Sequence, residues 1–139
     1  MTLQLNRPAP DFELPDFASK LHRLSDHRGR MVIVNFWSCE CPHSERADGL
    51  IMEWLKEWGE EVELLPIAAN RNESAQSLEE ASRSRNLPRV LIDAEHIVAD
   101  LYEASTTPHV FLVDRDGILR YRGAVDDVNK TRQELAKPD

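Results

Sequence analysis

The sequence predicts an α/β fold in which helices cover both faces of a mixed central sheet. The run Met31–Trp37 is continuously apolar and rich in β-branched residues, which indicates a strand buried on both faces. Apolar residues at three- and four-residue spacing follow it and predict an amphipathic helix. Nearer the carboxyl end, Asp114–Gly117 separates the apolar runs His109–Val113 and Leu119–Arg122, which predicts a hairpin. Strands joined by a helix and strands joined by a turn together predict a mixed sheet.

The amino-terminal part predicts a hairpin extension to this sheet. Two short apolar segments, Asp11–Leu14 and Leu21–Leu24, flank the turn-forming stretch Pro15–Lys20. A further turn is predicted at Arg28–Arg30, around Gly29, just before the first long strand.

The middle of the chain contains the clearest helix and a second buried strand. Gly59 ends the helix, and Val62–Ala69 is again continuously apolar. The apolar stripe of the helix consists of Ala47, Leu50, Ile51, Trp54, Leu55 and Trp58.

The remaining elements are shorter. The polar helix over Glu73–Arg85 is expected to be exposed, and Pro88 closes it. The other expected elements are a strand over Val90–Ile92, a helix over Glu95–Tyr102, and a final helix from Asp127 capped by Asp126 or Asp127.

Length, composition and charge limit the classes of function. A chain of 139 residues without repeats or an evident linker predicts a single domain spanning residues 1–139. The net charge of -8 argues against nucleic acid as a partner, because phosphate binding requires clustered cations. The longest uninterrupted apolar stretch, Met31–Val34, is too short to span a membrane. Residues 1–15 lack the pattern of a secretory signal, so we expect a cytoplasmic protein.

The link between the first long strand and the amphipathic helix carries reactive groups. Pro42 suits the first helical position and places Cys41 at the N-cap, facing unpaired N–H groups and the positive end of the helix dipole. That environment lowers the pKa of a cysteine thiol and favours the thiolate. Protonated His43 and the Ser44 hydroxyl would stabilise the anion further, whereas the carboxylate of Glu40 opposes it.

The stretch Asn35–Ser44 resembles the active-site turn of the thioredoxin superfamily, most closely the redoxin branch of alkyl hydroperoxide reductase and thiol-specific antioxidant proteins. Such proteins have Asn-Phe-Trp followed by Cys-x-x-Cys. Here Cys41-Pro42-His43-Ser44 replaces that motif, with Ser44 in place of the resolving cysteine. The Pro-His dipeptide also occurs in strongly oxidising periplasmic members. The resemblance implies a thioredoxin-like fold and thiol–disulfide exchange at Cys41.

A second motif supports the resemblance. Residues 106–114 are similar to the Thr-Pro-x-x-Phe-Leu-x-Asp strand of the family, and Pro10-Asp11-Phe12 is similar to its entry segment. By this likeness Pro108 follows a cis peptide bond and lies against Cys41, and the Thr107 backbone pairs with an extended substrate. The residues expected on the substrate side are Trp37, Pro42, Thr107 and Pro108.

The missing second cysteine leaves two routes for resolving a mixed disulfide on Cys41. Either an outside thiol of the glutathione kind attacks it, or Cys39 does. Two extended residues span roughly 6.6–7.2 Å between Cα atoms, whereas a disulfide needs about 4.4–6.8 Å. A Cys39–Cys41 bond therefore requires a turn at Glu40.

The leading hypothesis is a thiol–disulfide oxidoreductase that acts through Cys41 on protein or low-molecular-weight disulfides and needs no cofactor. The alternative is a catalytically silent thioredoxin-fold binding module. Peroxidase activity is less favoured, because Ser38 stands three residues before Cys41, where peroxidases of the superfamily carry threonine, and Val34 stands where they carry proline. Cys39, Cys41 and His43 form a Cys-x-Cys-x-His pattern, but three ligands so close together rarely complete a copper or zinc site. We therefore expect no metal.

Overall fold

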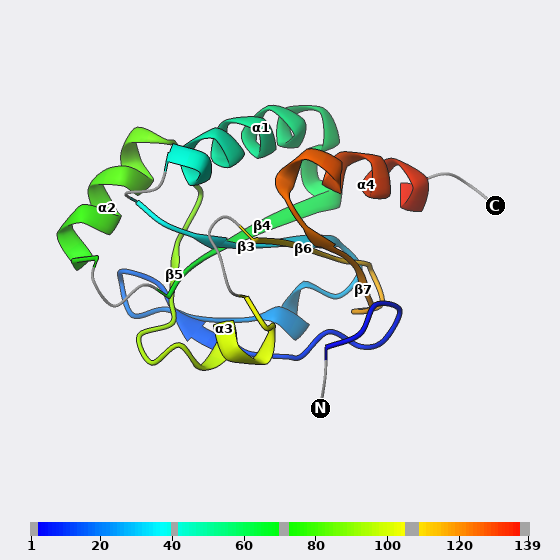
Figure 1. Cartoon of the computed structure of the whole chain (residues 1–139), viewed down its shortest axis with the longest axis horizontal. Helices are drawn as coiled ribbons and strands as arrows, with labels where there is room; N and C mark the ends of the chain where they lie inside the picture. The colour runs from blue at the N-terminus through cyan, green and yellow to red at the C-terminus, as the bar shows by residue number, and fades with distance from the viewer. Residues whose placement is uncertain (1–2, 40–41, 70–72, 105–108, 137–139) are drawn as a thin grey trace.

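A computed structural model of the chain describes residues 3–39, 42–69, 73–104 and 109–136. Its centre is a five-stranded sheet with the strand order β5-β4-β3-β6-β7 (Figure 1). β3 pairs in parallel with β4 and antiparallel with β6, so the predicted mixed sheet is confirmed. The strands are β3 (Met31–Trp37), β4 (Val62–Ala68), β5 (Leu91–Ile92), β6 (His109–Val113) and β7 (Leu119–Gly123).

Helices lie on both faces of this sheet, as the sequence predicts (Figure 1). On one face, α1 and α4 pack through Ala47, Ile51 and Val128 onto a cluster that includes Ile33 and Leu64. On the other face, α3 contributes to a second cluster together with the amino-terminal segment. The helices are α1 (Pro42–Trp58), α2 (Ala75–Ser84), α3 (Ile97–Leu101) and α4 (Val128–Ala136).

The predicted amino-terminal hairpin is present as a separate two-stranded sheet, β1 (Glu13–Pro15) and β2 (Leu21–Arg23). Leu14 is buried in the second cluster. The centre of that cluster is aromatic, because the ring of Tyr102 lies 5.8 Å from Phe36 and 5.1 Å from Phe111. The hairpin extension therefore packs on the same face of the sheet as α3.

Two helices begin later than the sequence predicts, for local reasons. α2 begins at Ala75 because the side chain of Ser74 accepts the Ser77 N–H at 3.1 Å and caps the helix there. α3 begins at Ile97 because His96 has a left-handed conformation, with φ of 65°, which interrupts the helical backbone. α4 begins at Val128, directly after the predicted start. None of the helices in the described ranges has both the length and the apolar composition needed to cross a membrane.

Asp93 fixes the start of α3, and replacing it by alanine is expected to destabilise the fold. Its buried carboxylate accepts the N–H groups of Ile97 at 3.0 Å and Ala99 at 2.8 Å. Leaving these donors without their acceptor costs about 1–2 kcal/mol of unfolding free energy, measurable by urea denaturation. Asp100→Ala on the same helix is the control, because that side chain is exposed and is paired with His96 at the surface. Equal losses in the two variants would contradict the capping role of Asp93.

Candidate functional site

The amphipathic helix α1 begins at Pro42, at the position that the sequence predicts. Its end is also confirmed, since Gly59 follows with a positive φ of 60°. Pro42 as the first helical residue sets the start of the helix directly after Cys41. Cys41 itself lies outside the described residues, as do Glu40, Thr107 and Pro108. The N-cap position of the thiol and the cis bond before Pro108 therefore stay predictions.

Ser44, which the sequence resemblance aligns with the resolving cysteine, is fully buried in the first turn of α1. Its Oγ accepts the N–H of Ser38 at 3.2 Å. A hydroxyl can accept and donate together, so this bond leaves the proton of Ser44 for a second partner. His43, the residue before it, is exposed. Among the described residues, no three His, Cys, Asp or Glu side chains lie close enough together to hold a metal ion.

Trp37 is the last residue of β3 and directly precedes Ser38 and Cys39, which are the described part of the turn that leads to α1. The side chain is fully buried at the end of β3, and its Nε1–H donates to Oδ2 of Asp48 on α1 at 2.6 Å. The expected place of Trp37 on the substrate side stays a prediction.

Arg85, which follows α2, binds the same carboxylate and the backbone of the turn. Its Nη1 donates to the carbonyl oxygen of Ser38 at 3.2 Å and to Oδ2 of Asp48 at 3.1 Å. Its Nη2 donates to the carbonyl oxygen of Cys39 at 2.9 Å. The guanidinium also lies over the ring of Trp37, 5.3 Å from its centroid. One side chain thus joins α1, α2, β3 and the turn.

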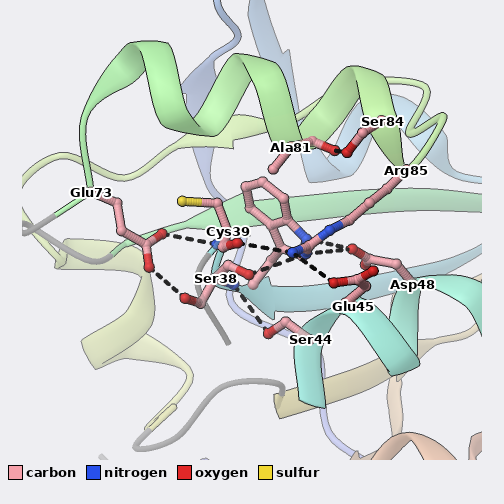
Figure 2. Close-up of polar contacts among 10 residues, drawn as sticks. Ser38, Cys39, Ser44, Glu45, Asp48, Glu73, Ala81, Ser84 and Arg85 are labelled. Atoms are coloured by element: carbon pink, nitrogen blue, oxygen red, sulfur yellow. Dashed lines mark hydrogen bonds and ion pairs between the residues drawn. The ribbon is translucent and has the colours of Figure 1, made fainter. Parts of the chain in front are cut away.

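Glu73, just before α2, binds the turn from another side. Its two carboxylate oxygens accept the hydroxyl of Ser38 and, at 3.1 Å, the N–H of Cys39. Figure 2 shows Glu73 and Arg85 on opposite sides of these two residues, with Ser44 below them. The backbone leading to Cys41 is therefore held by side chains from three separate segments.

Asp48 is a buried carboxylate with an unusual protonation equilibrium. Burial raises its pKa to about 6, and the hydrogen bonds from Trp37 and Arg85 only partly oppose this rise. Oδ2 receives both of these bonds, whereas buried Oδ1 has no hydrogen-bond partner among the described residues. The group is thus partly protonated in mildly acidic solution.

Cys39 is partly buried, and its side chain packs on α2 and the sheet. Its neighbours in this small cluster are Trp37, Ala68, Leu78 and Val90. Figure 2 shows its sulfur directed away from Ser44 and from the first turn of α1. The backbone of Cys39 is held at its N–H by Glu73 and at its carbonyl by Arg85.

A groove of about 450 Å³ lies beside the turn, between the hairpin loop and α2. Phe17, Ala68, Glu73, Leu78 and Ile92 are among the residues that line it. Glu73 belongs to both the groove and the turn, so a molecule in the groove would lie next to the group that binds Cys39.

Sequence reasoning missed three residues of this site, namely Asp48, Glu73 and Arg85. A signal existed for Asp48, because a carboxylate stands on the buried stripe of α1, between Ala47 and Ile51. Glu73 and Arg85 belong to a polar helical segment in which nothing distinguishes them from their exposed neighbours.

Comparisons with known proteins agree with the fold and with the sequence resemblance. Residues 5–122 match the AhpC/TSA family. The chain is 35% identical over 113 residues to "Thiol-disulfide oxidoreductase ResA" of Geobacillus kaustophilus (strain HTA426), a match that covers 78% of this chain and 63% of that protein.

Solved structures show the same fold. The thioredoxin domain of a thiol-disulfide oxidoreductase from Bacteroides vulgatus superposes with a TM-score of 0.85 at 18% identity, covering 98% of this chain and 100% of that one. A structure described as a putative thiol:disulfide interchange protein DsbE from Chlorobium tepidum gives 0.81 at 21% identity, covering 97% and 98%. At these identities the likeness establishes the thioredoxin-like fold alone.

Proposed function

This chain belongs to the AhpC/TSA family, and on that basis we propose that it is a thiol–disulfide oxidoreductase whose nucleophile is Cys41. The observation that carries the proposal is the start of α1 at Pro42, directly after this cysteine. The unpaired N–H groups and the dipole of a 17-residue helix favour a thiolate next to its first turn. The substrates are disulfides of proteins or of small thiols, in line with the thiol–disulfide oxidoreductases to which the chain is similar.

The proposed reaction begins with attack by the Cys41 thiolate on one sulfur of a substrate disulfide. A new S–S bond joins Cys41 to that sulfur, and the other substrate sulfur leaves as a thiolate that takes up a proton. An external thiolate then attacks the Cys41 sulfur, so that a new S–S bond joins the two and the bound substrate sulfur leaves as a thiolate. A second external thiolate attacks the external sulfur of this adduct, which forms a disulfide of the external thiol and returns Cys41 as a thiolate. The electron pairs that reduce the substrate therefore come from thiols.

We assign the second step to an external thiol of the glutathione kind. Ser44 occupies the resolving position but has no sulfur. Cys39 is bound through both its N–H and its carbonyl, and its thiol packs on the α2 side. A Cys39–Cys41 bond would need a tight turn at Glu40. Site geometry therefore favours a monothiol cycle.

Insulin reduction by dithiothreitol tests this proposal. Cys41→Ser is expected to abolish catalysed turnover because it removes the nucleophile, whereas Cys39→Ser should retain most of it. Cys39→Ser is the matched control, since these are the two cysteines of the chain. Loss of turnover in both variants would contradict the monothiol cycle and favour a Cys-x-Cys pair.

Absence of turnover in the wild-type protein would instead support a binding module of the same fold. Mass spectrometry after incubation with oxidised glutathione separates the outcomes further. The monothiol proposal expects one glutathione on Cys41, and an internal disulfide would refute it.

A further inference from the structure

We infer that Arg85 is a positioning residue for the reactive turn. It acts by binding the carbonyl groups of Ser38 and Cys39, the two residues that come directly before Glu40 and Cys41. The inference rests on the proposed function, because it concerns the reactivity of Cys41. Arg85 lies outside both sequence motifs, 46 residues along the chain from Cys39.

The geometry requires a guanidinium. Nη1 and Nη2 separately donate to the carbonyl oxygens of Ser38 and Cys39, and Nη1 also donates to Asp48. A planar group with two terminal nitrogens can hold two successive carbonyls in fixed directions, whereas an ammonium is a single point of attachment. These bonds direct the carbonyl groups of Ser38 and Cys39 toward Arg85.

Burial shows that Arg85 is part of the site and not a surface charge. Its side chain is 10% exposed, whereas that of Arg83, in the last turn of α2, is 77% exposed and pairs with Glu79. A buried cation is retained only where its partners compensate for lost hydration. Here those partners are the turn carbonyls, Asp48 and the ring of Trp37.

The positive charge of Arg85 lies beside the first turns of α1, where it is paired with Glu45 and Asp48. Described charged groups around the turn are Glu73 before α2, the carboxylates Glu45 and Asp48 on α1, and Arg85 itself. His43 on α1 is exposed. Removing Arg85 takes away the cation that is paired with Glu45 and Asp48 and leaves these carboxylates near the turn, which disfavours the thiolate.

The test compares Arg85→Met with Arg83→Met, both in a Cys39→Ser background in which Cys41 is the only thiol. Iodoacetamide alkylation across pH gives the midpoint of Cys41 ionisation. The midpoint should rise by roughly half a pH unit or more in Arg85→Met and stay unchanged in Arg83→Met. We also expect the rate of mixed-disulfide formation with insulin to fall by about tenfold in Arg85→Met, because the thiolate is less well directed. An unchanged midpoint and rate in folded Arg85→Met would overturn the inference.

Arg85→Lys keeps the charge and provides a second variant should Arg85→Met fold poorly, as thermal denaturation would reveal. The lysine variant should partly restore the midpoint of Cys41 ionisation. Its rate of mixed-disulfide formation with insulin should stay reduced, because an ammonium group cannot hold both carbonyls. Full recovery of midpoint and rate would show that charge alone acts, and the positioning role would be wrong. A parent protein that neither alkylates at lowered pH nor exchanges with insulin would instead refute the proposed function.

Discussion

Replacing Asp48 by alanine is expected to lower the free energy of unfolding by roughly 3–5 kcal/mol, because it breaks a buried ion pair from one side. The side chains of Asp48 and Arg85 are 2% and 10% exposed. Alanine leaves the Arg85 guanidinium without its carboxylate and the buried Trp37 Nε1–H without an acceptor. Urea denaturation at neutral pH measures the loss. A loss below about 1 kcal/mol, the usual range for an exposed pair, would contradict the buried pair.

Asp48→Asn is the matched control, since an amide keeps the shape and one acceptor oxygen. It should cost less than half as much as alanine, because it can still accept from Trp37 or Arg85. Similar losses in the two variants would show that charge, and not hydrogen bonding, accounts for the effect.

Comparison of the wild type with Asp48→Asn also gives the sign of the pH dependence of the free energy of unfolding. Burial raises the pKa of Asp48 from its ordinary 3.8 to about 6, so the folded state binds this proton more tightly than the unfolded state. The stability of the wild type relative to Asp48→Asn therefore falls as the pH rises from 3.8 to about 6, and it is constant above that range. A relative stability that increases with pH in this range would mean that the pKa of Asp48 is lowered in the folded protein.

The architecture is predictable because its signals are local. β3 is a continuous buried run, and α1 shows its stripe at helical spacing, begins at a proline and ends at a glycine. The places where prediction failed are also local but depend on one residue's conformation. Because the backbone of His96 is left-handed, α3 begins only at Ile97. The residue type alone does not predict this conformation at one particular histidine.

Only the part of the site that lies within one segment could be predicted. The start of α1 at Pro42 and the place of Ser44 in its first turn follow from the motif and are confirmed. The contacts of Cys39 with Glu73 and Arg85 join residues 34 and 46 positions apart. Such contacts depend on how α2 docks, which hydrophobic periodicity does not specify because α2 is largely polar.

Ser44→Cys is expected to change the chemistry of the site more than any other single substitution, by adding an internal resolving thiol. Residue 44 lies three positions after Cys41, one turn along the start of α1, so its sulfur would face the same mixed disulfide. Intramolecular attack replaces collision with an external thiol, which should shorten the lifetime of a glutathione adduct on Cys41 at least about 100-fold. Mass spectrometry of the adduct over time, without added thiol and in a Cys39→Ser background, measures the change.

The substitution also removes the hydroxyl that accepts the Ser38 N–H, so a stability loss of about 1 kcal/mol is expected alongside the gain in rate. Ser44→Ala in the same background separates the two effects, because it loses the hydrogen bond but adds no sulfur. Its adduct should last as long as that of the parent. An adduct equally long-lived in Ser44→Cys would mean that residue 44 does not face the Cys41 sulfur, and that Ser44 does not stand in for a resolving cysteine.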